Sequence, residues 1–254
     1  MAKIKQNQFN TALYKKIILF VVFVVLLFAF TNKSTSEKIS NAFHSTMVNN
    51  GFAVKDVILY GRKNSYKDEI LKQTNIEYGQ SIFSIDVNEI KQNIEKISWI
   101  KSVSVERQFP NRINIKIKER KPIAIWQLNK KHYIIDKNGT VITDKDIEKF
   151  SYLKTVVGKD ANKKAVSFLK LIASDPAMSQ IVEAGVYVSK RRWDLLILDK
   201  VTVKLPAYDA KNAWLVLGKY AREKNLLARP ISVIDMRVPK KIFIKMKKKS
   251  KKKI

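Results

Sequence analysis

Two short runs pair a serine with a lysine three residues later, the arrangement in which serine acyl-enzymes hold their nucleophile. They lie at residues 98–101 and 167–170. Enzymes of that class also need a Ser-x-Asn element and a Lys-Thr-Gly strand. The sequence has neither, because Lys154 and Thr155 are followed by Val156 instead of glycine. We therefore expect no acyl-transfer chemistry from either run.

Other candidate chemistry is equally weak. Asp136, Asp144 and Asp146 could supply a carboxylate pair for sugar hydrolysis, but Asp136 opens an Asp-x-Asn-Gly run that is typical of a turn. Cysteine is absent, which removes disulfides, thiolate chemistry and zinc-thiolate sites. For the two histidines, His44 and His132, we expect structural or solvent-exposed roles. The sequence predicts no enzyme, no bound metal and no cofactor.

The chain is strongly basic, with 50 Lys and Arg against 22 Asp and Glu in 254 residues and a net charge of +28. Such an excess usually indicates phosphate backbones as partners. We do not expect nucleic acid, because no Gly-rich phosphate loop, RNA-binding aromatic signature or zinc-finger spacing accompanies it. The basic tail at 247–254 is either a solvated, disordered end or a weak contact for anionic lipid or wall polymer.

An uninterrupted apolar run from Ile17 to Phe30 predicts a membrane anchor. Its fourteen residues rise about 21 Å, which is short of a hydrocarbon core of about 30 Å. The flanking Lys15 and Lys16 can extend the span by snorkelling. A cleaved signal peptide is the alternative, but residues 29–32 lack a small-x-small exit. We favour an uncleaved transmembrane anchor at 17–32.

The charges that flank the anchor predict its orientation. Residues 1–16 contain four lysines and no acidic residue, whereas both signs follow the apolar run. The positive-inside rule therefore places 1–16 in the cytoplasm and the bulk of a single-pass inner-membrane protein in the periplasm. Residues 33–50, with Ile39, Phe43 and Met47 at four-residue spacing, are expected to form a juxtamembrane linker helix.

Residues 51–121 carry the pattern of a small α+β module. Apolar and polar residues alternate at 103–105 and at 113–117, and Pro110 lies between these two segments. This pattern predicts two strands joined as an antiparallel hairpin. Asp86 is expected to cap a helix over 87–97. A strand over 52–60 and a helix capped by Ser65 complete the order β-α-α-β-β. A mixed three-stranded sheet with both helices on one face would bury the apolar faces of these strands and helices.

Residues 122–246 predict a mostly antiparallel β domain with two helices. Two strands are expected to meet at a turn where Gly139 supplies a positive φ. Apolar residues at helical spacing predict the helices at 162–173 and 210–223. The fold class of the chain is therefore α+β after one N-terminal transmembrane helix. Five further strands are expected at 184–189, 193–198, 201–205, 231–237 and 242–246.

Both domains resemble the bacterial division family called FtsQ or DivIB, particularly its alphaproteobacterial members. The first is similar to the POTRA domain of that family through Trp99, Arg107, Pro110 and the Glu-Arg-x-Pro-x-Ala exit that begins at Glu119. The second resembles the β domain that follows POTRA. The matching segments there are Tyr133-x-x-Asp136-x-x-Gly139, Arg191-Arg192-Trp193, Val203-x-Leu205-Pro206 and Ile234-Asp235-Met236-Arg237-x-Pro239.

The resemblance implies a non-enzymatic divisome scaffold at the division septum. Such a scaffold links early septal proteins to FtsB- and FtsL-type coiled-coil partners and to septal wall synthesis, and FtsK-type proteins are further candidate partners. In the family, the late strands of the β domain receive the FtsB-type partner as an added strand. The positions of this chain that match those strands are Arg237, Val238, Ile242, Phe243 and Ile244. The alternative is that Ile242 and Ile244 only pack the sheet.

A second interaction surface, for recruitment, is expected on the POTRA-like module. It lies either on the helix face with Val87, Lys91 and Glu95 or on the edge strand near Val54, and the sequence does not decide between them. Other users of this module suggest an alternative function, a docking or chaperone factor in envelope protein assembly. That class is expected to carry repeated modules of this kind, and the sequence shows one.

Overall fold

The computed structural model describes residues 16, 18–21, 23, 33–198 and 201–247. Two compact units make up the chain, and each is described by itself. The first unit comprises Met1–Arg62, Tyr66–Glu95 and Ser102–Ile117. The second comprises Lys63–Ser65, Lys96–Lys101 and Lys118–Ile254.

The predicted anchor at 17–32 falls mostly outside the described residues, as do Lys15 and nearly all of the basic tail at 247–254. Lys16 is described and is exposed in a helical segment. Among the residues that the structure describes, no helix is both long and apolar enough to cross a bilayer.

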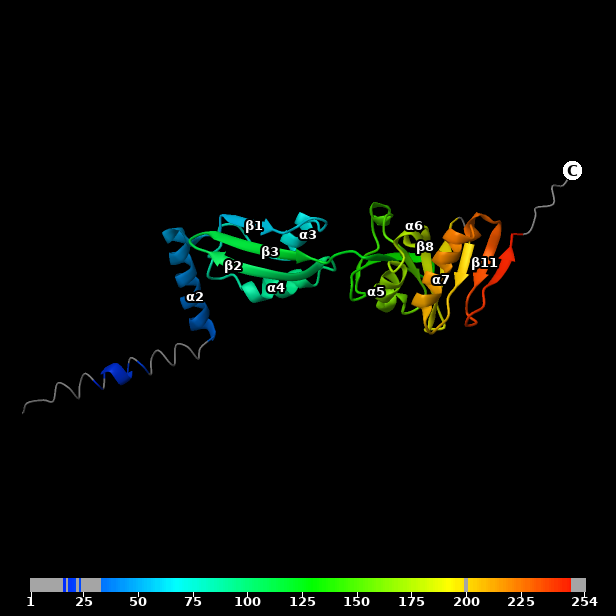
Figure 1. The fold of residues 1–254 in the computed structure, drawn as a ribbon. Coiled ribbons are helices and arrows are strands. Elements are labelled where there is room, and N and C mark those ends of the chain that lie inside the picture. The colour runs from blue at the N-terminus through cyan, green and yellow to red at the C-terminus, as the bar shows by residue number, and fades with distance from the viewer. Residues whose placement is uncertain (1–15, 17, 22, 24–32, 199–200, 248–254) are drawn as a thin grey trace, which may run out of the picture. The chain divides into compact units, whose positions relative to one another are not determined.

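The first unit contains a mixed three-stranded sheet (Figure 1). The edge strand β1 (Asp56–Tyr60) runs parallel to the central strand β3 (Arg112–Glu119), and β2 (Ile100–Gln108) forms the other edge. The ends of β2 and β3 that contain Ile100 and Glu119 belong to the second unit. The helices are α2 (Lys33–Met47), α3 (Lys67–Lys72) and α4 (Val87–Glu95). The predicted order β-α-α-β-β is confirmed.

Isoleucines form the core of the first unit. Alternation along β3 buries Ile113 and Ile115 and leaves Lys116 exposed. Burial of one such side chain stabilises the fold by about 1.5–3 kcal/mol relative to leaving it in water. Asp86 caps α4 as predicted, because its carboxylate accepts the backbone N–H of Asn88 at 2.8 Å. The helices add Ile70, Ile90 and Ile94 to the buried set.

The strand expected over 52–60 is shorter than predicted. Residues Val48–Phe52 form a π-helical turn in which Gly51 has a φ of 89°. The backbone N–H of Val54 then donates to the carbonyl of Gln80 at 2.8 Å, so this segment is held outside the sheet. β1 therefore begins only at Asp56.

Glu119, in the Glu-Arg exit of the module, holds the backbone before α3. Its carboxylate accepts the backbone N–H groups of Lys63, Asn64 and Ser65 at 2.8–3.0 Å, and the hydroxyl of Ser65. Desolvation alone would raise the pKa of Glu119, but these hydrogen bonds outweigh it and lower the pKa. The prediction that Ser65 caps the helix is wrong, since α3 begins at Lys67 and the Ser65 hydroxyl bonds Glu119 instead.

The second unit contains a nine-stranded sheet (Figure 1). Its strands are β4 (Ala124–Leu128), β5 (Lys131–Ile135), β6 (Val141–Thr143), β7 (Thr155–Val157), β8 (Val182–Val188), β9 (Arg192–Ile197), β10 (Val201–Lys204), β11 (Ile231–Asp235) and β12 (Phe243–Met246). Their order across the sheet is β12-β11-β10-β9-β8-β7-β4-β5-β6. Five of the eight neighbouring pairs are antiparallel, which confirms the mostly antiparallel prediction.

Three α-helices lie in the described part of this unit: α5 (Ala161–Ile172), α6 (Pro176–Gln180) and α7 (Ala210–Glu223). The first and last are the two predicted helices. The sequence pattern missed α6, because five residues are too few to show helical periodicity. Its start is nevertheless well defined, since Asp175 accepts the backbone N–H of Met178 at 3.2 Å and Pro176 follows the cap.

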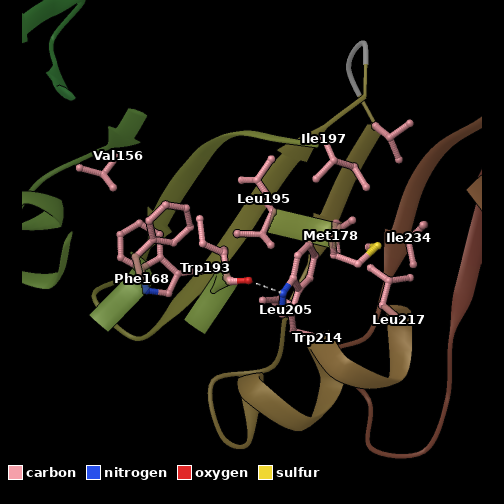
Figure 2. Close-up of a cluster of buried hydrophobic side chains, with 14 of the residues drawn as sticks. Val156, Phe168, Met178, Trp193, Leu195, Ile197, Leu205, Trp214, Leu217 and Ile234 are labelled. Atoms are coloured by element: carbon pink, nitrogen blue, oxygen red, sulfur yellow. Dashed lines mark hydrogen bonds between the residues drawn. The ribbon is translucent and has the colours of Figure 1, made fainter. Parts of the chain in front are cut away.

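Trp214 of α7 is at the centre of the core of the second unit. Its indole N–H donates to the carbonyl of Ile172 at 3.1 Å. Figure 2 shows Trp214 among apolar side chains from β9 and β11, including Leu195 and Ile234. Phe168 of α5 packs against Trp193 of β9, with ring centroids 4.7 Å apart. Ile234 of β11 belongs to the same cluster. The last part of the sheet is therefore fixed to a close-packed core.

Asp136 has the predicted turn role between β5 and β6. Its carboxylate accepts the backbone N–H groups of Asn138 at 2.8 Å and Thr140 at 3.0 Å, and Gly139 has a φ of 77°. The Arg120 guanidinium donates to the same carboxylate at 3.0 Å. The side chain of Asp136 is 5% exposed, so this ion pair is largely shielded from water.

Replacing Asp136 with asparagine should lower the free energy of unfolding of the second unit by about 2–3 kcal/mol at neutral pH, because Arg120 loses its counter-charge. Desolvation raises the pKa of Asp136, but the hydrogen bonds from Thr140, Asn138 and Arg120 outweigh it and lower the pKa. A lowered folded-state pKa stabilises the fold above the unfolded-state pKa, and that contribution is lost as the pH falls through the folded-state pKa.

Urea unfolding of the wild-type protein and of the Asp136→Asn variant, followed by tryptophan fluorescence, measures this contribution. The stabilities should differ at neutral pH and converge as the pH falls below the lowered folded-state pKa of Asp136, because the wild-type carboxyl is then protonated too. A difference that stays the same across this range would assign the loss to packing instead of charge.

Candidate protein-interaction site

The last strand, β12, forms one edge of the nine-stranded sheet. It pairs with β11 on one side, with Ile244 opposite Ile234 and Phe243 opposite Asp235. All four of its residues are exposed, and Phe243 and Ile244 keep 53% and 41% of their accessible surface. An apolar edge strand of this kind presents unpaired backbone groups and apolar side chains together.

The direction of the backbone groups of β12 follows from one bond at its end. The N–H of Lys247 donates to the carbonyl of Pro230 at 2.7 Å, so Lys247 faces β11. Backbone groups alternate in direction along an antiparallel strand, which makes Phe243 and Lys245 face β11 as well. The N–H and C=O groups of Ile244 therefore point away from the sheet, toward the open edge, whereas the C=O of Met246 accepts the hydroxyl of Ser232 at 3.3 Å.

A surface groove of about 450 Å³ lies beside the start of β12. One wall is α7, which contributes Val216 and Tyr220. The other wall is the connection from β11 to β12, which contributes Val238, Lys241 and Ile242. The groove is thus partly apolar, carries a basic wall and adjoins the open edge.

Arg237 is held by a residue on its own sheet. Its guanidinium donates to both carboxylate oxygens of Asp235, at 2.6–3.0 Å. The side-chain hydrogen bond from Arg237 is the main reason that the pKa of Asp235 is lowered. Arg237 is therefore prepositioned by Asp235 at the base of the connection to β12.

The five predicted partner-binding residues lie on one continuous segment, from Arg237 to Ile244. Val238 and Ile242 line the groove, and Ile242 also packs against the buried core. Phe243 and Ile244 lie on β12 with much of their surface exposed. Packing of the sheet thus accounts for part of the Ile242 side chain, whereas the exposed surface of Ile244 is free for contact.

Sequence reasoning missed the α7 wall of this site. Tyr208, before the helix, is 89% exposed, and Tyr220 is 44% exposed at the rim of the groove. Helical spacing places Tyr220 on the same face as Trp214 and Leu217, which are both fully buried, so the pattern alone predicts a core position for it. The residue type itself could have indicated this wall, because tyrosine has an apolar ring and a polar hydroxyl and is therefore suited to the rim of a binding site.

The predicted recruitment surface on the first unit needs one correction. Val87 is half-buried on α4, and Lys91 and Glu95 are exposed on the same helix at four-residue spacing, so these three lie along one helix face. Val54 is only 1% exposed, and its backbone N–H and C=O already bond Gln80 and Gly79. Val54 itself therefore belongs to the core and is not a surface residue, whereas β1, which follows it, is an edge strand of the three-stranded sheet.

The residues first considered for chemistry have structural contacts. Ser167 donates its hydroxyl to the carbonyl of Lys164 at 2.7 Å, and the carbonyl of Ser98 accepts from Arg120 at 3.0 Å. Asp146 pairs with Lys149. Within the described ranges, no three His, Asp or Glu side chains are grouped as a metal site would require.

Comparison with known proteins identifies both domains. Residues 52–120 match the family model described as "POTRA domain, FtsQ-type", and residues 124–237 match "Cell division protein FtsQ/DivIB, C-terminal". β12 lies beyond the second matched range.

Several curated relatives carry the name "Cell division protein FtsQ". That of Rickettsia felis is 33% identical over 238 residues, which cover 91% of this chain and 89% of the relative. That of Rickettsia prowazekii is 36% identical over 194 residues, covering 76% and 72%. That of Caulobacter vibrioides is 30% identical over 201 residues, covering 79% and 67%. The predicted family and its alphaproteobacterial character are confirmed, and this chain belongs to the FtsQ family of cell division proteins.

Proposed function

We propose that this protein is a non-enzymatic scaffold of the division machinery. Residues 17–32 anchor it in the inner membrane, residues 1–16 lie in the cytoplasm, and the rest of the chain, from residue 33 onward, lies in the periplasm. There it links early septal proteins to FtsB- and FtsL-type coiled-coil partners and to septal wall synthesis. The observation that carries the proposal is the open edge of β12 beside the groove of α7.

The mechanism is addition of a partner strand to β12. The outward N–H and C=O groups of Ile244 supply backbone hydrogen bonds, which give affinity without sequence preference. Specificity comes from side chains of the partner that enter the groove between Val216 and Val238. Lys240 and Lys241 on the groove wall favour a partner segment that carries acidic residues.

Recruitment uses a separate surface. The face of α4 that contains Val87, Lys91 and Glu95 is the proposed surface, the edge strand β1 near Val54 is the alternative, and FtsK-type proteins are the proposed partners. Charged residues on such a face contribute mainly to specificity and to the rate of association. Reversing the charge at Lys91 should therefore slow recruitment without unfolding the unit.

Depletion of the protein in its own bacterium, while a functional fluorescent fusion is imaged, tests the proposed function. We expect the fusion at midcell before depletion and filaments without septa afterwards. Normal septation together with unassembled envelope proteins would contradict the scaffold and support the alternative, a docking or chaperone factor in envelope assembly.

A further inference from the structure

Four phenylalanines from distant parts of the first unit form a patch outside its isoleucine core, and we call it the phenylalanine patch. They are Phe43 of α2, Phe52 of the π turn, Phe83 before α4 and Phe109 in the turn between β2 and β3. Phe83 is the centre, with ring centroids 5.9 Å from Phe43, 5.5 Å from Phe52 and 5.3 Å from Phe109. The Phe83 and Phe109 rings are stacked.

The phenylalanine patch is unusual because it is assembled and yet exposed. Phe109 keeps 55% of its accessible surface, Phe43 keeps 47% and Phe83 keeps 36%. Ile39, one turn before Phe43 on α2, is also exposed and extends the patch along the helix. Contiguous exposed apolar surface of this kind is typical of a site that contacts a membrane or another molecule.

The position of the phenylalanine patch in the chain indicates what covers it. α2 begins at Lys33, only three residues after the apolar run Ile17–Phe30 ends. α2 rises about 22 Å over its fifteen residues, so Phe43 lies well within reach of a membrane surface at the end of that run. Figure 1 places α2 beside the end of the sheet where β1 begins, and α3 at the opposite end.

We infer that the phenylalanine patch rests on the bilayer, in the boundary between headgroups and acyl chains, and that α2 lies along the membrane surface. This inference rests on the proposed anchoring of residues 17–32. Helices that lie in this boundary pair an apolar face that contains Phe with lysines that attract anionic headgroups. Lys38 on α2 and Lys55 before β1 are exposed and supply such charges.

The contact would give the first unit a second attachment to the membrane besides the anchor. A single attachment leaves a domain free to rotate about it, whereas two attachments fix the face that it presents. The bilayer would thereby orient the recruitment face of α4 toward neighbouring membrane proteins.

Site-directed spin labelling of the full chain in lipid nanodiscs tests the inference, because the natural sequence has no cysteine and each introduced cysteine is unique. Ile39→Cys and Phe109→Cys place a nitroxide in the patch. Asn41→Cys is the matched control on the opposite face of α2, and Lys72→Cys is the control at the far end of the unit. Collision rates with oxygen and with a water-soluble nickel chelate then report bilayer contact.

We expect the oxygen-to-nickel accessibility ratio at residues 39 and 109 to exceed that at 41 and 72 by about threefold or more. Equal ratios at 39 and 41 would overturn the inference even if the Phe109 variant folds poorly. Spin–spin broadening between two labels at residue 109 would show that a second copy covers the patch, which also overturns it.

A label at residue 24, in the apolar run, separates failure of the inference from failure of the proposed anchoring. If the nitroxide of Val24→Cys has the accessibility of the bilayer interior and residue 109 does not, only the membrane contact of the patch is refuted. If residue 24 is accessible to the nickel chelate as well, the anchoring itself is refuted.

Discussion

Replacing Ile244 with proline is expected to weaken capture of an FtsB-type partner by about 30-fold or more while leaving the second unit folded. The N–H of Ile244 points away from β11, so its loss breaks no bond within the sheet. Proline is tolerated on an edge strand when its missing N–H is the outward one, but it blocks the addition of another strand. The substitution therefore tests strand addition at the edge without disturbing the folded sheet.

The measurement is calorimetric titration of the full chain in detergent with the periplasmic segment of the partner. Ile244→Val is the matched control, because it keeps the backbone donor and the branched side chain, and its affinity should stay within about threefold of wild type. Lys245→Pro is the contrasting variant. Its missing N–H faces β11, so β12 itself should detach, and hydrogen exchange at Asp235, whose N–H faces β12, should rise.

Unchanged capture by a folded Ile244→Pro chain would show that the partner does not add to this edge. Substitution of Val216 by glutamate would then ask whether the groove acts alone, because a carboxylate placed there should repel an acidic partner segment.

Replacing Gly61 with alanine is expected to destabilise the first unit by roughly 3–5 kcal/mol, the largest stability effect in this unit. Gly61 has a φ of 82°, a conformation that costs an L-residue about 1–2 kcal/mol. An added Cβ would also meet the carbonyl oxygen of Ile117 at 2.1 Å. That oxygen belongs to the backbone of the central strand β3, so it cannot move aside without distorting the sheet.

Gly79 supplies the control for this prediction. Its φ is 90°, yet a Cβ at this position meets no heavy atom within 4 Å. Gly79→Ala should therefore show the backbone cost alone, about 1–2 kcal/mol. Hydrogen exchange of the amides of Ile113 and Ile115 reports on this unit specifically. Equal losses in the two variants would assign the whole effect to backbone conformation and contradict the predicted clash.

Local patterns were enough to predict most elements of this fold. Alternation with period two located β3 and the late strands, and helical spacing located α4, α5 and α7. Turn chemistry identified the roles of Asp86 and Asp136, because each bonds backbone groups only two to four residues away. Both partners of such an interaction lie within a few residues of each other, so a short stretch of sequence is enough to predict it.

Short or irregular segments escaped this reasoning. α6 has too few residues for a period, and the π turn before β1 replaced an expected strand. Ser65 follows the pattern of a helix cap, but its hydroxyl bonds Glu119, which is 54 residues away in the chain. A distant partner of this kind overrides a local preference worth about 1 kcal/mol.

The sequence by itself determined the family, the two domains and the segment that contains the candidate site, because these depend on residue types at fixed spacing. Tertiary structure alone decided that β12 ends the sheet, that Tyr220 forms the other wall of the groove and that Val54 is buried. It also brought Phe43, Phe83 and Phe109 together. The physical reason is that exposure and contact depend on strand order and packing between residues far apart in the chain, which no local pattern records.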